Sequence, residues 1–394
     1  MQRSKRILYI GTYERDYPRN VTVIAAMRRA GYDVREIHRS VWAAAGDKSA
    51  MISSPARLAN LGLRLIVAYV SLIRDLIRAR NDADLIAFGY IGQLDVLVLG
   101  PVARLMGKPI LFNPLVTLTD TLVEDRQTVA PNGPPARIIR LIDRLSLGLS
   151  TSVLADTVEN QQFVTTMFKL PRSKVRVIPV GADDEVFHPP LTPTEINRNG
   201  SPLRVLFYGN MIPLQGVETI VRAANLLRDE PDVTFDIVGT GQVFESIRSQ
   251  ARNLHVDNIT FIPRWPYEQL PLQISRSDII LGIFGDSPKA ARVVPNKVYQ
   301  AMAMGASIVT RDSPASREML HDGESALLIS PADSESLAAA IRQLRDPALR
   351  QRLGLSARDR YVKAASLEVQ TVRVDQVITQ LLGERATVHG EVMA

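Results

Sequence analysis

Hydrophobic positions along the chain alternate between short β-branched runs and longer segments with helical spacing. In the first half the short runs lie at about 7–10, 85–88, 109–112, 152–155 and 175–180, and the helical segments at about 21–30, 94–106, 138–149 and 158–168. Strands that alternate with helices predict a parallel sheet covered on both faces, because right-handed strand–helix–strand units pack in this way.

This alternation stops at residues 189–202, where prolines, a glycine and polar residues carry no periodic pattern, as is typical of a linker. Beyond the linker, strand patterns return at about 204–208, 234–238, 259–262, 279–283, 307–309 and 326–329, and helical patterns at about 217–228, 243–252, 298–304, 334–344 and 348–364. The second half therefore repeats the architecture of the first.

We expect an α/β protein with two doubly wound, Rossmann-like domains that face a central cleft. The predicted domains are residues 1–188 and 203–365, joined by the linker 189–202 and followed by a helix in 366–394 that packs back toward the first domain. Ligands of such sheets bind beyond the carboxyl ends of the strands, so we expect the functional site there.

Composition excludes several classes of protein. The chain has 394 residues, of which 46% are hydrophobic, and it has no cysteine, which excludes disordered chains, disulfide scaffolds and thiolate metal sites. The longest stretch without charge that we find is the 13 residues between Lys297 and Arg311, whereas a membrane span needs about 18 apolar residues. The first residues lead directly into the strand pattern, so we expect a cytoplasmic protein without a signal peptide.

The net charge is +6, with a sequence pI near 9.6. No basic–aromatic pattern indicates nucleic-acid binding. The segment 57–80 is helical in pattern, apolar at its centre and rich in arginine. Two interpretations remain open for it: a helix that covers the first sheet with its arginines in water, or a helix that lies on an anionic membrane.

Three segments of the second half combine a strand end with glycines or bases. The first, 206–217, contains Gly209, Asn210, Gln215 and Gly216, and the second, 237–241, contains Gly239 and Gly241. The third, 287–305, reads as a basic loop with Lys289 and Arg292, followed by a helix that starts near Pro295 and contains Lys297. Glycines let a ligand approach the backbone, and helix amino termini offer N–H groups to phosphate oxygens.

In this order and at this spacing, the three segments resemble the donor-binding half of family 4 glycosyltransferases, also called group 1, which have the GT-B fold. Asp156-Thr157, the string Val177–Asp183, Phe187-His-Pro189 and the downstream Gly323 extend the resemblance over most of the chain. The resemblance implies transfer of a sugar, with retention, from a UDP-, GDP- or dTDP-linked donor to a hydroxyl. It also implies a role in the synthesis of envelope glycans or glycolipids, with no cofactor besides the donor.

The chain departs from the family pattern at several positions. Many members have a Glu-x7-Glu pair where this chain has Arg292 and Gln300, and a basic pair where it has Asn210 and Gln215. Pro295-Asn-Lys297 resembles the start of this helix in a subset of the family. Two alternatives to a transferase stay open, namely an inactive nucleotide-sugar-binding protein and a nucleotide-sugar epimerase.

Donor chemistry requires stabilisation of negative charge on the leaving diphosphate. No Asp-x-Asp follows a strand, since Asp82-Ala-Asp84 is expected to cap a strand start, so we predict a site without a metal. Arg292 is predicted to be the main phosphate-binding cation, with Lys297 as a second catalytic cation. The predicted donor-binding residues are Gly209, Asn210, Gln215, Gly216, Gly239, Gly241, Trp265, Lys289, Val294, Gln300 and Glu318.

For the acceptor, Asp120 is the first candidate to orient or deprotonate the hydroxyl, and Asp125 is the second. The alternative is that Asp120 caps a turn while residues 124–125 lie in solvent. The predicted acceptor-binding residues are Gly11, Tyr13, Asn20, Asn113 and Asp125. The expected partners are a nucleotide sugar, a glycan or lipid-linked acceptor and, by peripheral contact, an anionic membrane, but no nucleic acid.

Overall fold

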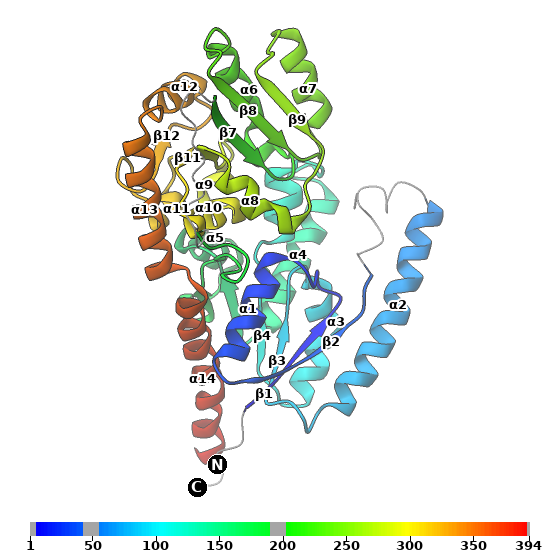
Figure 1. Cartoon of the computed structure of the whole chain (residues 1–394). Helices are drawn as coiled ribbons and strands as arrows, with labels where there is room; N and C mark the ends of the chain where they lie inside the picture. Colours follow the sequence, from blue (N-terminus) through cyan, green and yellow to red (C-terminus); the bar gives the residue numbers. More distant parts are fainter. Residues whose placement is uncertain (1–4, 42–54, 190–201, 392–394) are drawn as a thin grey trace. The chain divides into compact units, whose positions relative to one another are not determined.

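The computed structural model describes residues 5–41, 55–189 and 202–391, which form two compact units (Figure 1). Unit 1 comprises residues 1–121, 129–179 and 370–394, and unit 2 comprises residues 122–128 and 180–369. Each unit contains one six-stranded parallel sheet. The expected fold class, two doubly wound parallel sheets, is confirmed.

Unit 1 has the strand order β2-β1-β3-β4-β5-β6. Its strands are β1 (Arg6–Gly11), β2 (Asp33–His38), β3 (Leu85–Phe88), β4 (Ile110–Phe112), β5 (Ser152–Ala155) and β6 (Val175–Val177). Its helices are α1 (Pro18–Arg29), α2 (Pro55–Arg78), α3 (Gln93–Leu105), α4 (Pro134–Leu149), α5 (Val158–Phe168), the π-helix η2 (Thr119–Asp125) and the 3-10 turn η3 (Arg172–Lys174). The chain leaves unit 1 within η2.

The sequence patterns located each strand of unit 1 except β2. This strand has only Val34 and Ile37 as apolar residues, because it lies at the edge of the sheet and pairs with β1 alone. An edge strand with one partner buries less of its surface, so its hydrophobic pattern is weak. Asp84 has the expected capping role, since its carboxylate accepts the backbone N–H of Arg6 at 2.8 Å.

Unit 2 has the strand order β12-β11-β10-β7-β8-β9. Its strands are β7 (Leu203–Tyr208), β8 (Val233–Val238), β9 (Ile259–Ile262), β10 (Ile279–Leu281), β11 (Ile308–Arg311) and β12 (Leu327–Ile329). Its helices are α6 (Val217–Leu226), α7 (Phe244–Asn253), α8 (Leu270–Ser275), α9 (Pro288–Arg292), α10 (Asn296–Met304), α11 (Pro314–Met319), α12 (Ser334–Gln343) and α13 (Pro347–Ala364), with 3-10 turns η4 (Pro213–Gln215) and η5 (Tyr267–Gln269). Apolar residues of α6, α7 and α12 share one buried cluster with β7 and β8.

The final helix, α14 (Leu367–Glu391), joins unit 1 from Gln370 onward. The hydroxyl of Tyr32, just after α1, donates to Asp375 at 2.6 Å, and Figure 1 shows α14 and α1 on the same side of the sheet. The chain passes into unit 2 at Val180, eight residues before the expected end of the first domain. Residues 180–187 belong to unit 2 because Ala182 and Asp184 bond the buried Tyr361 of α13. Most of the expected linker lies outside the described residues.

Two glycines bring the strand ends of unit 2 into close contact. Gly239 follows β8 with φ +135°, and a Cβ there would lie 2.0 Å from the carbonyl oxygen of Gly209 at the end of β7. No side chain fits at that distance. The carboxyl edge of the sheet therefore depends on the missing side chain of Gly239.

We predict that Gly239→Ala lowers the free energy of unfolding by more than about 3 kcal/mol, because it adds a backbone clash to the strain of a positive φ. Gly323→Ala is the matched control: Gly323 also has a positive φ, +69°, but has no atom within 4 Å of the added Cβ. It should lose about 1–2 kcal/mol. Urea unfolding followed by circular dichroism measures both, and equal losses would contradict the clash.

Candidate functional site

Lys297 lies at the carboxyl edge of the unit 2 sheet, in the first turn of α10. Only 4% of this residue is exposed. Its Nζ donates to Gln215 Oε1 at 2.6 Å and to the Gly282 carbonyl at 3.3 Å, and it lies 3.5 Å from the centre of the Phe207 ring. Burial lowers the pKa of Lys297 well below its usual value. None of the carboxylates in the described residues forms an ion pair with it.

One glycine of the predicted donor site, Gly209, lies against this lysine. A Cβ on Gly209, which has φ +146°, would lie 3.3 Å from Lys297 Nζ, so the absent side chain leaves the ammonium room. Gly216 has φ +62° and forms the N-cap of α6. A Cβ on Gly216 would lie 2.4 Å from the backbone nitrogen of Gly285. Gly241 contacts Met211 in a similar way, while Asn210 is exposed beside Gly209. The structure therefore brings Gly209, Gln215 and Lys297 together.

Gln300 is buried inside unit 2. Its Oε1 accepts a hydrogen bond from the hydroxyl of Tyr208 at 2.9 Å, and only 4% of the residue is exposed. Burial raises the pKa of Tyr208 well above its usual value, so that this phenol stays a donor. Gln300 does not lie on an exposed helix surface, because α10 is buried along nearly its whole length.

The residues around Lys289 and Arg292 form a short helix, α9, and not the expected loop, because Ser287 caps it and Pro288 begins it. Arg292 Nη2 pairs with Glu124 Oε2 at 2.8 Å, and Lys289 Nζ lies 3.8 Å from Asp125 Oδ2. Both bases of α9 thus face an acidic segment, residues 122–128, that belongs to unit 2 although the chain on either side of it belongs to unit 1.

The placement of Asp125 overturns one interpretation. Residues 124–125 do not lie in solvent: Asp125 is 1% exposed, and the side chain of Glu124 is 26% exposed. Asp125, predicted to bind the acceptor, is instead a neighbour of the donor-site base Lys289. The sequence contained one signal, the two consecutive acids Glu124 and Asp125. They precede Lys289 and Arg292 by 164 or more residues, and no local pattern connects the two segments.

The remaining predicted donor residues lie on separate elements of unit 2. Val294 is 3% exposed, between α9 and α10. Trp265 is partly buried after β9, and Glu318 is partly buried in α11, whose start is closed by a capping box of Ser313 and Ser316. The structure does not bring these three residues together.

Arg311 is a cation that the sequence patterns did not single out. It ends β11, is 6% exposed, and its guanidinium bonds the carbonyl of Gly285. Burial lowers the pKa of Arg311, and Asp286 and Asp312 oppose that change. Its position just after the predicted strand 307–309 was the one sequence feature that could have identified Arg311 as a candidate site residue. Lys297 and Arg311 therefore both lie at carboxyl strand ends of unit 2.

Most predicted acceptor residues of unit 1 serve internal contacts. Tyr13 is 1% exposed and donates to Glu36 at 2.8 Å. Asn20 is fully buried, accepts from the hydroxyl of Tyr9 at 3.0 Å, and donates to the Tyr90 carbonyl at 2.7 Å. Gly11 has φ +146° because Asp95 lies against it, and a Cβ would be 2.2 Å from that carboxylate.

Asp120 belongs to a buried group of charges in unit 1. The residue is 2% exposed in the π-helix η2 and lies near Asp143 and Asp156, since its charge raises the pKa of both. Desolvation is the main cause of these shifts, and it raises the pKa of Asp156 to about 6. The fully buried Arg19 donates to Asn113 Oδ1 at 2.8 Å. Its positive charge offsets part of the rise in the pKa of Asp156.

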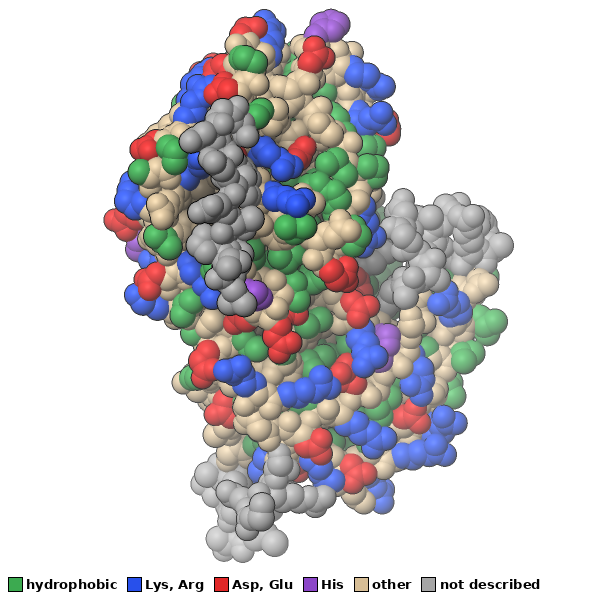
Figure 2. All heavy atoms as spheres, in the orientation of Figure 1, with side chains coloured by type: hydrophobic (Ala, Val, Ile, Leu, Met, Phe, Trp, Pro, Cys, Tyr) green, Lys and Arg blue, Asp and Glu red, His purple; other side chains and the backbone are tan. Residues whose placement is uncertain are grey.

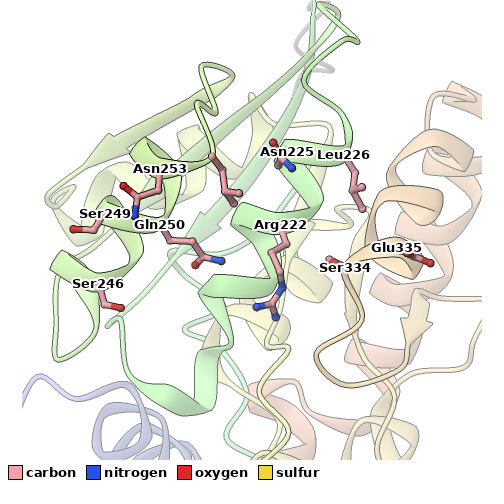
Figure 3. Close-up of a pocket in the computed structure, with 10 residues that line it drawn as sticks. Arg222, Asn225, Leu226, Ser246, Ser249, Gln250, Asn253, Ser334 and Glu335 are labelled. Atoms are coloured by element: carbon pink, nitrogen blue, oxygen red, sulfur yellow. The ribbon is translucent and has the colours of Figure 1, made fainter.

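A pocket of about 660 Å³ lies elsewhere in unit 2, between α6, α7 and the start of α12 (Figure 3). Arg222, Gln250 and Glu335 are among the residues that line it. None of the predicted donor or acceptor residues takes part in its lining. Within the described ranges, no cluster of His, Asp and Glu side chains has the geometry to hold a metal ion.

Residues 202–346, which contain the edge around Lys297, match the profile of the family described as glycosyl transferases group 1. A D-inositol 3-phosphate glycosyltransferase from Acidothermus cellulolyticus is 26% identical over 288 residues, 68% of this chain and 61% of that protein. This match thus spans less than two thirds of the relative.

Solved structures share the fold over nearly the whole chain. Sucrose-phosphate synthase from Thermosynechococcus elongatus has a TM-score of 0.73 at 17% identity and covers 96% of this chain and all of its own. The HepE protein from Anabaena, in complex with UDP-glucose, has a TM-score of 0.69 at 14% identity, with 95% and 99% covered. Residues 202–346 are thus similar to the group 1 glycosyl transferases, and the two parallel sheets have the GT-B fold.

Proposed function

We propose that the protein is a glycosyltransferase that moves a sugar from a nucleotide-sugar donor to a hydroxyl acceptor, with retention and without a metal. The observation that carries this proposal is Lys297, a buried base at the carboxyl edge of the unit 2 sheet that forms no ion pair with a carboxylate of the described residues. Burying an ammonium that no carboxylate neutralises is costly, and perturbed buried groups of this kind occur most often at functional sites.

The chemistry of the donor explains why such a cation is useful. Cleavage of the anomeric bond leaves negative charge on the bridging phosphate oxygen, and preorganised donors lower the barrier. Lys297 is held by Gln215 and Gly282 before any ligand arrives, so it needs little reorganisation. A lysine in the first turn of a helix also opposes the helix dipole by about 0.3–1 kcal/mol, a cost that a bound phosphate removes.

The relatives support the same class of donor. The HepE protein was solved with UDP-glucose, and the Acidothermus relative is named as a glycosyltransferase. We therefore propose that the donor is a nucleotide-linked sugar. UDP is the first nucleotide to test, followed by GDP and dTDP. For the acceptor we propose a glycan or lipid-linked intermediate of polysaccharide or glycolipid synthesis, with Asp120 orienting or deprotonating its hydroxyl.

A second candidate is a protein that binds the donor without transferring the sugar. In its favour, Arg292 and Gln300 replace the two glutamates of the family pattern, and both side chains have internal partners, Glu124 and Tyr208. Turnover distinguishes the two: a transferase slowly hydrolyses its radiolabelled donor even without an acceptor, whereas a binding protein only retains it.

We also propose that the protein works in the cytoplasm and contacts the inner face of the membrane peripherally. The net charge of +6 and the arginines of α2 support this. In the part of the chain that the structure describes, no helix is long and apolar enough to cross a bilayer.

The first prediction concerns Lys297. Lys297→Met should reduce kcat/KM for the preferred donor by on the order of 10²–10³, the effect of removing one donor to the transition state. Lys363→Met, an exposed lysine of the same unit, is the control and should keep normal turnover. Near-normal turnover of Lys297→Met would overturn the proposed donor site.

Lys297→Met should also change how the stability of the protein depends on pH. The pKa of Lys297 is lowered in the folded state, so the native protein binds fewer protons than the unfolded one between that pKa and about 10.4. Its stability should therefore rise with pH through this window. Above the lowered pKa and up to about pH 10, the Tm of the native protein should therefore rise with pH relative to that of Lys297→Met, as measured by calorimetry.

A further prediction tests the acidic segment. We propose that Arg292 binds the donor diphosphate, and because Glu124 pairs with Arg292, Glu124 competes with that ligand. Arg292→Ala should lower kcat/KM by on the order of 10²–10³, and Arg292→Lys should recover only part of it, since a lysine cannot bind two oxygens in a fork. Glu124→Gln should tighten nucleoside diphosphate binding in calorimetry. Unchanged affinity in both Arg292→Ala and Glu124→Gln would remove Arg292 from the site.

Metal independence is the last prediction here. Turnover should persist in EDTA, because cations of the protein supply the positive charge. If EDTA abolishes turnover and Mn²⁺ or Mg²⁺ restores it, the prediction is wrong.

A further inference from the structure

Helix α2 exposes an apolar stripe to solvent. Leu63, Ile66, Val67 and Val70 are each 63–65% exposed, and their spacing of three and four residues places them on one face of the helix. The opposite face packs on the sheet of unit 1, where Leu72 and Leu76 are fully buried. A surface helix normally turns polar residues outward, so this helix is apolar on both faces.

Helix α4 has the same arrangement. Ile138, Leu141 and Leu145 are 48–59% exposed at the same helical spacing, while Leu147 on the other face belongs to the same buried cluster as Leu72 of α2. The two helices are separated along the chain by α3, which contacts both of them. The unit therefore carries two outward apolar stripes beside one core.

Arginines accompany both stripes. Arg74 and Arg78 follow the stripe of α2, and Arg137 and Arg144 alternate with that of α4; all four are exposed. On helical geometry, the arginines of each helix lie along one flank of its stripe. Figure 2 shows hydrophobic and basic side chains together along the edge of the molecule that α2 forms.

Acidic residues are turned away from these faces. Each helix has one, Asp75 in α2 and Asp143 in α4. The side chain of Asp75 is 18% exposed and binds Arg39, and Asp143 is 1% exposed and accepts from Thr119 at 2.7 Å. Arg74 Nε also lies 3.5 Å from Asp75 Oδ1, so this acid offsets part of the charge of α2, and the outward faces remain apolar with a net positive charge.

We propose that α2 and α4 together form a docking face for an anionic bilayer. Apolar side chains enter the boundary between headgroups and acyl chains, while flanking arginines bind lipid phosphates, as in helices that lie in the membrane interface. A second copy of the chain fits this face less well, since pairing like faces would place arginines against arginines. Soluble monomers rarely leave such patches uncovered.

This inference deepens the proposed function, because it places the acceptor half of a glycosyltransferase at a lipid surface. A lipid-linked acceptor would then meet the enzyme in two dimensions. The test below needs neither donor nor acceptor, so its failure and the failure of the proposed activity are distinguishable.

The experiment is flotation of the full chain with vesicles of phosphatidylcholine alone or with added phosphatidylglycerol. Binding should require the anionic lipid and should weaken with salt. Arg137→Gln with Arg144→Gln should weaken binding by on the order of 30-fold, from about 1 kcal/mol for each arginine. The matched control, Arg228→Gln with Arg252→Gln, removes the same charge from exposed positions of unit 2 and should bind normally.

The apolar stripe is tested separately. Val67→Ser with Val70→Ser should weaken binding at low salt, whereas Leu272→Ser with Leu355→Ser, at exposed positions of unit 2, should not. Absence of binding to anionic vesicles at low salt would overturn the proposal, as would equal losses in test and control variants. Light scattering provides the third check: a dimer in solution that Val67→Ser with Val70→Ser dissociates would show that the face binds a second copy instead.

Discussion

The ammonium of Lys297 is the group on which the carboxyl edge of unit 2 depends. Its neighbours surround one buried amino group: Gly209 leaves space for it, Gln215 Oε1 and the Gly282 carbonyl accept hydrogen bonds from it, and the Phe207 ring lies against it. These are dipoles and an aromatic face, not a neutralising carboxylate. They keep the lysine in place without a carboxylate, and because they do not offset its desolvation, the pKa of Lys297 is lowered well below its usual value.

The bases of α9 follow a different rule. Arg292 and Lys289 face Glu124 and Asp125, on a short segment that folds with unit 2 although unit 1 supplies the chain on either side. Among the described residues, unit 2 thus contains a buried base without a carboxylate partner, Lys297, and two bases that face carboxylates. A phosphate that binds to Arg292 or Lys289 must first displace a carboxylate. Its net binding free energy is therefore smaller there than at Lys297.

Unit 1 combines a charged interior with an apolar outer face. Inside it, Arg19 and a group of buried aspartates are held by hydrogen bonds and by one another, and burial raises the pKa of Asp95 and Asp156 to about 6. Outside, α2 and α4 place leucine, isoleucine and valine in solvent. Both features cost stability, and neither is needed to form the sheet.

The sequence by itself determined the two parallel sheets, nearly all their strands and the glycines at the strand ends, because strand and helix periods and turn chemistry are local properties. It also indicated Lys297 and the helix that carries it. Tertiary structure alone decided which charges meet: Glu124 is paired with Arg292, 168 residues away, and Gln300 turns inward to Tyr208. Such contacts depend on how distant segments fold together, and no local spacing encodes them. The sequence of α2 has two apolar faces and does not show which of them the sheet will cover. Only the packing of the helix decided which face is exposed.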